Sequence, residues 1–95
     1  MVAAGLNYKS HIGEQSAAKY VGLFAKFPTS LTGHGADIIY PADATNLHYE
    51  AEVCVVMGKR AQNITEAEVK SHVFGVTPCN DVSERAWQRA DLQWF

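Results

Sequence analysis

The sequence lacks the features of several common protein classes. It has no apolar run near the roughly 20 residues that cross a bilayer, and its first residues lack the charged start and apolar stretch of a signal peptide. Eight basic residues stand against 10 acidic ones, so there is no basic excess of the kind that marks nucleic-acid binders. We therefore expect a cytoplasmic protein, or a mitochondrial matrix protein in a eukaryote, without nucleic-acid or membrane partners.

Cysteine is also scarce. The only two, Cys54 and Cys79, lie 25 positions apart and form no CxxC pair. This usage is typical of a reducing compartment, where cysteines stay as thiols. We expect two buried free thiols, neither a disulfide nor a zinc site.

What is present is enough for one small domain. The chain has 95 residues, of which 47% are hydrophobic and 19% charged. It stops at Trp94 and Phe95, although termini normally lie at the surface and fray. We therefore expect residues 1–95 to be part of a longer protein, cut at both ends.

The local patterns predict a strand-rich α+β fold. Thr65 and Glu68 have the spacing of a capping box at a helix start. The segment 47–57 alternates at first and is then apolar on both faces, as in a buried central strand. Strands and helices do not alternate along the sequence, so a parallel sheet is not expected. The expected strands are residues 1–7, 23–27, 38–40, 47–57 and 73–77, and the expected turn is 78–81. The expected helices are 65–72 and 83–94, with one or two further helical turns within 8–20, around His11 and Glu14.

Three carboxylates form the strongest chemical pattern. Glu50 and Glu52 share one face of the expected 47–57 strand, and Asp81 follows the next apolar strand at a turn. Two acids so close repel each other unless a cation or a proton intervenes. On spacing alone a solvated strand face is the better explanation of the pair, but the rest of the strand is too apolar for an exposed one. If the acids bind a metal, oxygen ligands without cysteine favour Mg²⁺, Mn²⁺ or Ca²⁺ over zinc.

His11 and Glu14 form a second pattern. On a helix, positions i and i+3 share a face, so the carboxylate can reach the imidazole. Such contact raises the basicity of a histidine and fixes its tautomer, as a general base requires. An H-x-x-E spacing is frequent by chance, and alone it decides nothing.

Four motifs in order resemble the fumarylacetoacetate hydrolase family. The run GLNYKSHIGE (5–14) is similar to the family pattern GxNYxxHxxE, and LFAK (23–26) to LFxK. LHYEAEV (47–53) resembles the strand pattern LHxExEL, and NDVSERAWQ (80–88) resembles NDVTARDxQ. Together the four cover nearly the whole chain.

The resemblance implies a role for each candidate residue. Glu50, Glu52 and Asp81 correspond to the metal ligands, for Mg²⁺ or Mn²⁺, and His11 with Glu14 to the catalytic dyad. The positions that line the substrate pocket correspond to Lys26, Arg85 and Gln88.

The resemblance also implies a fold, a length and partners. The family's fold is a mixed β-roll. Members of the family are usually dimers and are at least twice as long as this chain. Residues 1–95 would thus form part of the catalytic domain, partnered by the rest of that domain. Ser-Glu-Arg-Ala (83–86) departs from the usual Thr-Ala-Arg-Asp, and the family's later lysine segment has no counterpart here.

Three functions follow as hypotheses. The first is a metal-dependent hydrolase that cleaves a C–C bond in acylpyruvate-like or fumarylpyruvate-like 2,4-dioxo acids. The second uses the same enolate-stabilising site for decarboxylation or isomerisation of 2-oxo dicarboxylic acids. The third is a catalytically silent metal-binding or assembly module.

Overall fold

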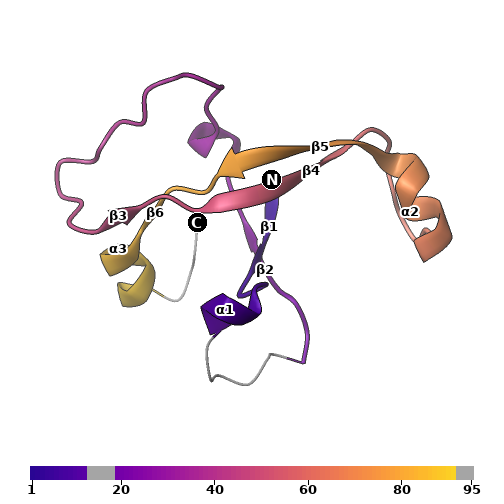
Figure 1. The fold of residues 1–95 in the computed structure, drawn as a ribbon, viewed down its shortest axis with the longest axis horizontal. Helices are drawn as coiled ribbons and strands as arrows, with labels where there is room; N and C mark the ends of the chain where they lie inside the picture. Colours follow the sequence, from indigo (N-terminus) through magenta and orange to yellow (C-terminus); the bar gives the residue numbers. More distant parts are fainter. Residues whose placement is uncertain (13–18, 92–95) are drawn as a thin grey trace. The chain divides into compact units, whose positions relative to one another are not determined.

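The computed structural model describes residues 1–12 and 19–91, which form a mixed α/β chain (Figure 1). Two compact units make up the chain. One contains Met1–Asp43 and Ala86–Phe95, and the other contains Ala44–Arg85. Glu14, Trp94 and Phe95 lie outside the described residues, so the predictions about them have no structural counterpart here.

The first unit is organised around a short antiparallel pair. Strand β1 (Val2–Gly5) pairs with β2 (Gly22–Ala25), and Met1 and Lys26 extend the pairing through two backbone bonds of 2.9 Å. A one-turn helix, α1 (Lys9–Ile12), follows β1, and a 3₁₀ turn, η1 (Pro28–Ser30), follows β2. The predicted strands at both positions are confirmed with shorter bounds.

The strand predicted at residues 38–40 is wrong. Ile38, Ile39 and Tyr40 have no strand assignment and are 53%, 87% and 56% exposed. A run of three residues needs a neighbouring strand to hold it as a strand. Pro41 cannot extend the run, because Pro lacks the N–H that a ladder requires. Within the described residues no strand pairs with it.

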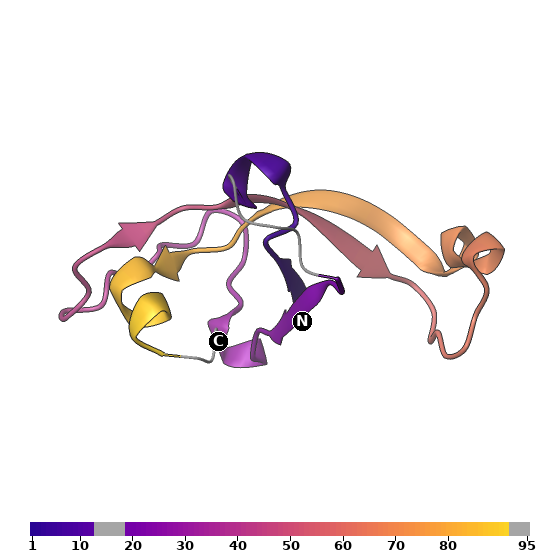
Figure 2. The same cartoon turned by 90° about the horizontal axis from the view of Figure 1, so that it is seen from below.

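The second unit contains one long two-stranded ribbon. Strand β4 (Ala51–Met57) pairs antiparallel with β5 (Val73–Asn80), with an irregularity between Val56 and Met57. Figures 1 and 2 show the two strands running side by side toward α2 (Glu66–His72), which joins them. The valines of β4 suit this pleated backbone because branched side chains favour strands. The turn predicted at 78–81 is mostly strand, since β5 continues to Asn80.

The segment predicted as one strand over 47–57 is two strands. Strand β3 (Leu47–His48) pairs with β6 (Ser83–Glu84), and β4 begins only at Ala51. The partner strand changes between them, because β6 and β5 are different stretches of chain. Glu50 therefore lies between two strands, and the expected shared strand face of Glu50 and Glu52 is corrected. The helix predicted at 83–94 likewise begins later, as α3 (Arg85–Ala90).

The start of α2 confirms the predicted capping box. The Glu68 carboxylate accepts hydrogen bonds from the N–H and the hydroxyl of Thr65, both at 2.8 Å. Acidic residues in the first turn and basic ones in the last also complement the helix dipole. At the other side of this connection, Gly58 is closely packed, because a Cβ there would lie 3.1 Å from the Cβ of Phe74 and the neighbouring side chain would have to move slightly.

The ribbon presents an exposed apolar face. Side chains on that face include Val53, Val55, Phe74 and Val76, which are 54% to 82% exposed. In the described part of the chain β4 has β5 as its one neighbour, and no hydrophobic side chain is fully buried. The apolar pattern predicts a strand that needs cover on both faces, and the described residues do not supply that cover. Among the described residues no helix is long and apolar enough to span a membrane.

Candidate functional site

The backbone brings Glu50 and Asp81 together at one end of the ribbon. The N–H of Asp81 donates to the carbonyl of Glu50 at 2.9 Å. The N–H of Glu50 donates in turn to Oδ1 of Asn80 at 3.0 Å. These bonds close the ladder just beyond the Ala51–Asn80 pair, so two of the three acids predicted as ligands are neighbours through their main chains.

The side chain of Glu50, in the 47–53 motif, is held by two groups from the 80–88 motif. Ser83 donates its hydroxyl to Oε1 at 2.8 Å, and Nη1 of Arg85 lies 3.1 Å from the same oxygen. The Arg85 and Glu50 side chains are only 14% and 23% exposed. An ion pair shielded in this way is costly to break from one side, because the remaining charge loses its counter-ion.

Glu52 and Asp81 share a neighbour, the thiol of Cys79. Glu52 faces Cys79 directly across the ribbon. The pKa of Cys79 is raised mainly by partial burial and next by the adjacent Cys54. The negative charges of Glu52 and Asp81 add smaller contributions in the same direction. Both carboxylates thus lie close enough to oppose ionisation of one thiol.

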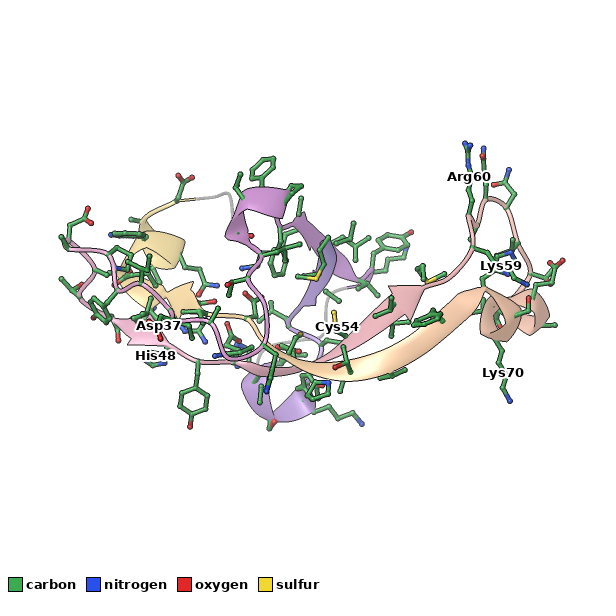
Figure 3. The ribbon with its side chains drawn as sticks, turned by 90° about the horizontal axis from the view of Figure 1, so that it is seen from above. Asp37, His48, Cys54, Lys59, Arg60 and Lys70 are labelled. Carbon is green, nitrogen blue, oxygen red and sulfur yellow. The ribbon has the colours of Figure 1, made fainter. Side chains whose placement is uncertain are left out.

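Neither cysteine is in a disulfide, as expected, although both are half-buried rather than buried. They lie on the same ribbon face as Glu52, since alternate residues of a strand point to the same side. Figure 3 shows Cys54 on the ribbon between its two ends.

The donor chemistry of the three acids fits a hard divalent cation, because every side-chain donor is a carboxylate oxygen. Their side-chain placement is a separate question. Within residues 1–12 and 19–91, no three His, Cys, Asp or Glu side chains gather as a metal-binding group. The Glu50 carboxylate turns to Ser83 and Arg85 instead. The assignment of Glu50, Glu52 and Asp81 as ligands remains a prediction.

The residues predicted for catalysis and substrate binding are distributed over several elements. His11 is exposed on α1, where its N–H bonds to the Tyr8 carbonyl at 3.0 Å. Lys26 directly follows β2, and its ammonium lies 5.6 Å from the centre of the Phe24 ring, a cation–π distance. Gln88 is half-buried on α3. The pairing of His11 with Glu14 remains a prediction.

One residue that the patterns did not identify is Glu84. It is 8% exposed, and its Oε1 accepts bonds from the N–H groups of Thr45 and Asn46. Bonds to a charged group each contribute roughly 1.5–3 kcal/mol. In the sequence Glu84 stood out only as a departure from the family pattern. Its partners lie 38 and 39 positions away, so no local spacing could reveal them.

The whole chain matches a known family. The model of the fumarylacetoacetate (FAA) hydrolase C-terminal domain covers residues 1–95. The chain therefore belongs to the fumarylacetoacetate hydrolase family, as its four motifs predict.

Individual relatives narrow the comparison. The chain is 39% identical to a fumarylacetoacetate hydrolase domain-containing protein 2 homolog of Dictyostelium discoideum and 37% identical to the mitochondrial oxaloacetate tautomerase Fahd2a of Rattus norvegicus. All of this chain aligns, to 32% and 31% of those proteins. A bifunctional isomerase/decarboxylase of homoprotocatechuate catabolism from Escherichia coli is 39% identical over 90% of the chain and 20% of its own length. This chain thus spans about a third of the first two relatives. No solved structure matches it.

Proposed function

We propose that the intact protein is a metal-dependent enzyme that interconverts keto and enol forms of a small 2-oxo dicarboxylic acid, or decarboxylates it. The observation that carries this proposal is the family match over all 95 residues. The names of two relatives, an oxaloacetate tautomerase and an isomerase/decarboxylase, support it further, because keto–enol exchange and decarboxylation of a 2-oxo dicarboxylic acid can share one enolate-stabilising site.

In this proposal Glu50, Glu52 and Asp81 hold one divalent cation, Mg²⁺ or Mn²⁺, with Ca²⁺ as an alternative. Bound there, the ion supplies Lewis-acid stabilisation of negative charge on the 2-oxo group. The backbone bond between Glu50 and Asp81 and the proximity of Glu52 and Asp81 to one thiol support a common location for the acids. To bind the ion, the Glu50 carboxylate would have to turn from its present contacts with Ser83 and Arg85.

His11 is the general base. One imidazole nitrogen accepts the proton from the carbon next to the 2-oxo group, the electron pair of that C–H bond forms a C=C bond to the carbonyl carbon, and the C=O π pair moves onto the oxygen. Return of the proton to the oxygen gives the enol, and its return to carbon gives the keto acid. Glu14 orients the imidazole and stabilises its charged form.

Cationic and amide side chains bind the rest of the substrate. Arg85 carries five donors in a planar fork, a geometry that suits a carboxylate such as that of the substrate, and its Nη1 lies 3.1 Å from Glu50. Lys26 supplies a second positive charge and Gln88 an amide. A small dianion is therefore the substrate class that this set suits.

Hydrolysis of a C–C bond in an acylpyruvate-like or fumarylpyruvate-like acid is the second candidate, supported by the H-x-x-E spacing of His11 and Glu14. Here His11 deprotonates a water that attacks the distal carbonyl. The C–C bond then breaks, and its electron pair remains on the carbon next to the 2-oxo group until a proton returns.

The proposal extends to location and partners. Residues 1–95 form part of a catalytic domain with the mixed β-roll fold, and the rest of that domain and a second copy in a homodimer cover its exposed apolar surface. The name of the rat relative supports a mitochondrial matrix location in a eukaryote, and the cytoplasm is the alternative in a bacterium.

One assay panel tests the reaction. The intact protein is incubated with enol oxaloacetate, keto oxaloacetate and an acylpyruvate, with Mg²⁺ or Mn²⁺ and with a chelator. We expect cation-dependent tautomerisation or decarboxylation. Cleavage of the acylpyruvate alone would favour the hydrolase. No turnover with any of the three, at any cation concentration, would leave the silent metal-binding or assembly module as the better description.

A further inference from the structure

Cys54 and Cys79 have no role in the proposed reaction, and the β4–β5 ladder places them on one face of the ribbon. Glu52 pairs with Cys79, and Cys54 pairs with Thr77. Because alternate residues of a strand point to the same side, the two cysteines are diagonal neighbours across the ribbon. The strand register thus brings together two residues that lie 25 positions apart in the sequence.

The two thiols are also in contact. The side chain of Cys79 is hydrogen-bonded to that of Cys54, and both residues are half-buried. Each sulfur therefore has the other as a reaction partner, held beside it by the backbone ladder. This arrangement differs from that of a single cysteine, whose oxidation products include no disulfide within the chain.

We propose that Cys54 and Cys79 form a modification site, a dithiol that a peroxide converts reversibly into a disulfide between β4 and β5. In the first step the O–O bond of hydrogen peroxide breaks, one thiol becomes a sulfenic acid and water leaves. In the second step the other sulfur attacks the sulfenic sulfur and the S–S bond forms. The sulfenic OH leaves as water with the proton of the second thiol, so the two electrons lost by the sulfurs have passed to the peroxide.

The resulting bond should be strained and easy to reduce. Diagonal neighbours in an antiparallel pair lie roughly 7–8 Å apart, whereas relaxed disulfides join Cα atoms about 4.4–6.8 Å apart. The twist between strands changes this distance, and a small slide of β4 against β5 closes the remaining gap. Strained disulfides have the more oxidising potentials and are the labile ones, so a dithiol reductant should restore both thiols.

The test treats the folded, intact protein with hydrogen peroxide and maps its tryptic peptides by mass spectrometry without reduction. Lys59, Arg60 and Lys70 lie between the two cysteines, so trypsin separates Cys54 from Cys79 unless a disulfide joins them. The peroxide is used in excess, because the raised pKa of Cys79 keeps this thiol protonated and a thiol reacts more slowly than a thiolate. We expect a cross-linked pair of peptides that disappears on adding dithiothreitol.

Three variants make the result specific. Cys54→Ser and Cys79→Ser should each abolish the cross-linked pair. The matched control is Val56→Cys in the Cys54→Ser background. Position 56 lies on the same face, but it is four residues from the position opposite Cys79, roughly 13 Å along the strand, so no link within the chain should form.

Four results would overturn the proposal. The first is that both thiols stay unmodified in excess peroxide. The second is oxidation of either cysteine to a sulfinic acid without the cross-linked pair. The third is a disulfide that joins two chains only, seen as a dimer on a non-reducing gel. The fourth is an equal yield of the link in the Val56→Cys control, which would mean that it forms in an opened state and not from the ladder register.

Discussion

The two units of the chain carry their candidate residues in different ways. In Ala44–Arg85, the three acids come from a stretch of 32 residues and are tied in by a seven-pair ladder, a backbone bond and an ion pair. In the other unit, His11 is exposed on a four-residue helix and Lys26 follows a four-residue strand. The difference indicates that the proposed metal site is built within one unit, whereas the proposed base depends on a short, exposed element. Loss of metal and loss of chemistry should therefore be separable.

The largest effect is expected from the base. His11→Ala should lower turnover of the intact enzyme by about 10²–10⁴-fold, the usual contribution of a positioned general base. Mn²⁺ affinity should stay unchanged, since His11 is not among the proposed ligands. Steady-state kinetics and calorimetry on the same preparation check both statements. Near-normal turnover would remove His11 from the mechanism. Loss of Mn²⁺ binding would make His11 a ligand, and loss of metal and loss of chemistry would then no longer be separable.

The second effect concerns Glu52. Glu52→Gln keeps the size of the side chain but removes its charge, so Mn²⁺ affinity should fall by about 100-fold or more. Residues that only orient a metal ligand typically cost about 10–100-fold, and a lost ligand should cost at least as much. Glu52→Gln should also lower the pKa of Cys79 slightly, because the negative charge of Glu52 is one of the smaller causes that raise this pKa. Iodoacetamide labelling of Cys79 against pH, in chelator, measures this independently of metal. An unchanged labelling profile would mean that Glu52 is not beside the thiol.

A third prediction concerns the apolar face of the ribbon. If the rest of the intact protein or a second copy covers Val55, a lysine there must be buried. Val55→Lys should then reduce the free energy of unfolding by roughly the 1.5–3 kcal/mol that a buried side chain contributes, or more. Gln62→Lys, in an exposed loop, is the matched control. Denaturant unfolding and sedimentation of both variants distinguish the cases, and equal stabilities would leave the face exposed to water.

How much of this could be predicted from the sequence depends on how local each feature is. The capping box of Thr65 and Glu68 was predictable because its partners are three positions apart. The β4 strand was predictable from its valines. Four motifs in order identified the family. The switch of partner at Glu50 was not predictable, because it depends on where β5 ends and β6 begins.

The site follows the same rule. The acids could be selected as candidates by residue type, and their nearness to Cys79 follows from the strand register. The bonds of Glu84 and the ion pair between Glu50 and Arg85 join residues more than 30 positions apart. Such contacts are fixed by the path of the chain in space, and no periodicity in the sequence records them.

The smallest effect is expected at the cap of helix α2. The backbone N–H of Thr65, and then its hydroxyl, lower the pKa of the Glu68 carboxyl below its ordinary value of 4.5. The folded state therefore holds this proton less tightly than the unfolded state. The stabilising contribution is present above the unfolded pKa and is lost as the pH falls through the folded one.

Thr65→Ala removes the hydroxyl and keeps the N–H, so the pKa of Glu68 should rise part of the way back toward its ordinary value. Carbon-detected NMR titration of the intact protein measures it. Ser71→Ala is the control, because the Ser71 hydroxyl donates to the Glu68 carbonyl at 2.8 Å and not to its carboxylate. If Glu68 titrates identically in the wild type and Thr65→Ala, the hydroxyl does not contribute to the cap. If Ser71→Ala shifts it as strongly, the change reflects fraying of α2 rather than the hydrogen bond itself.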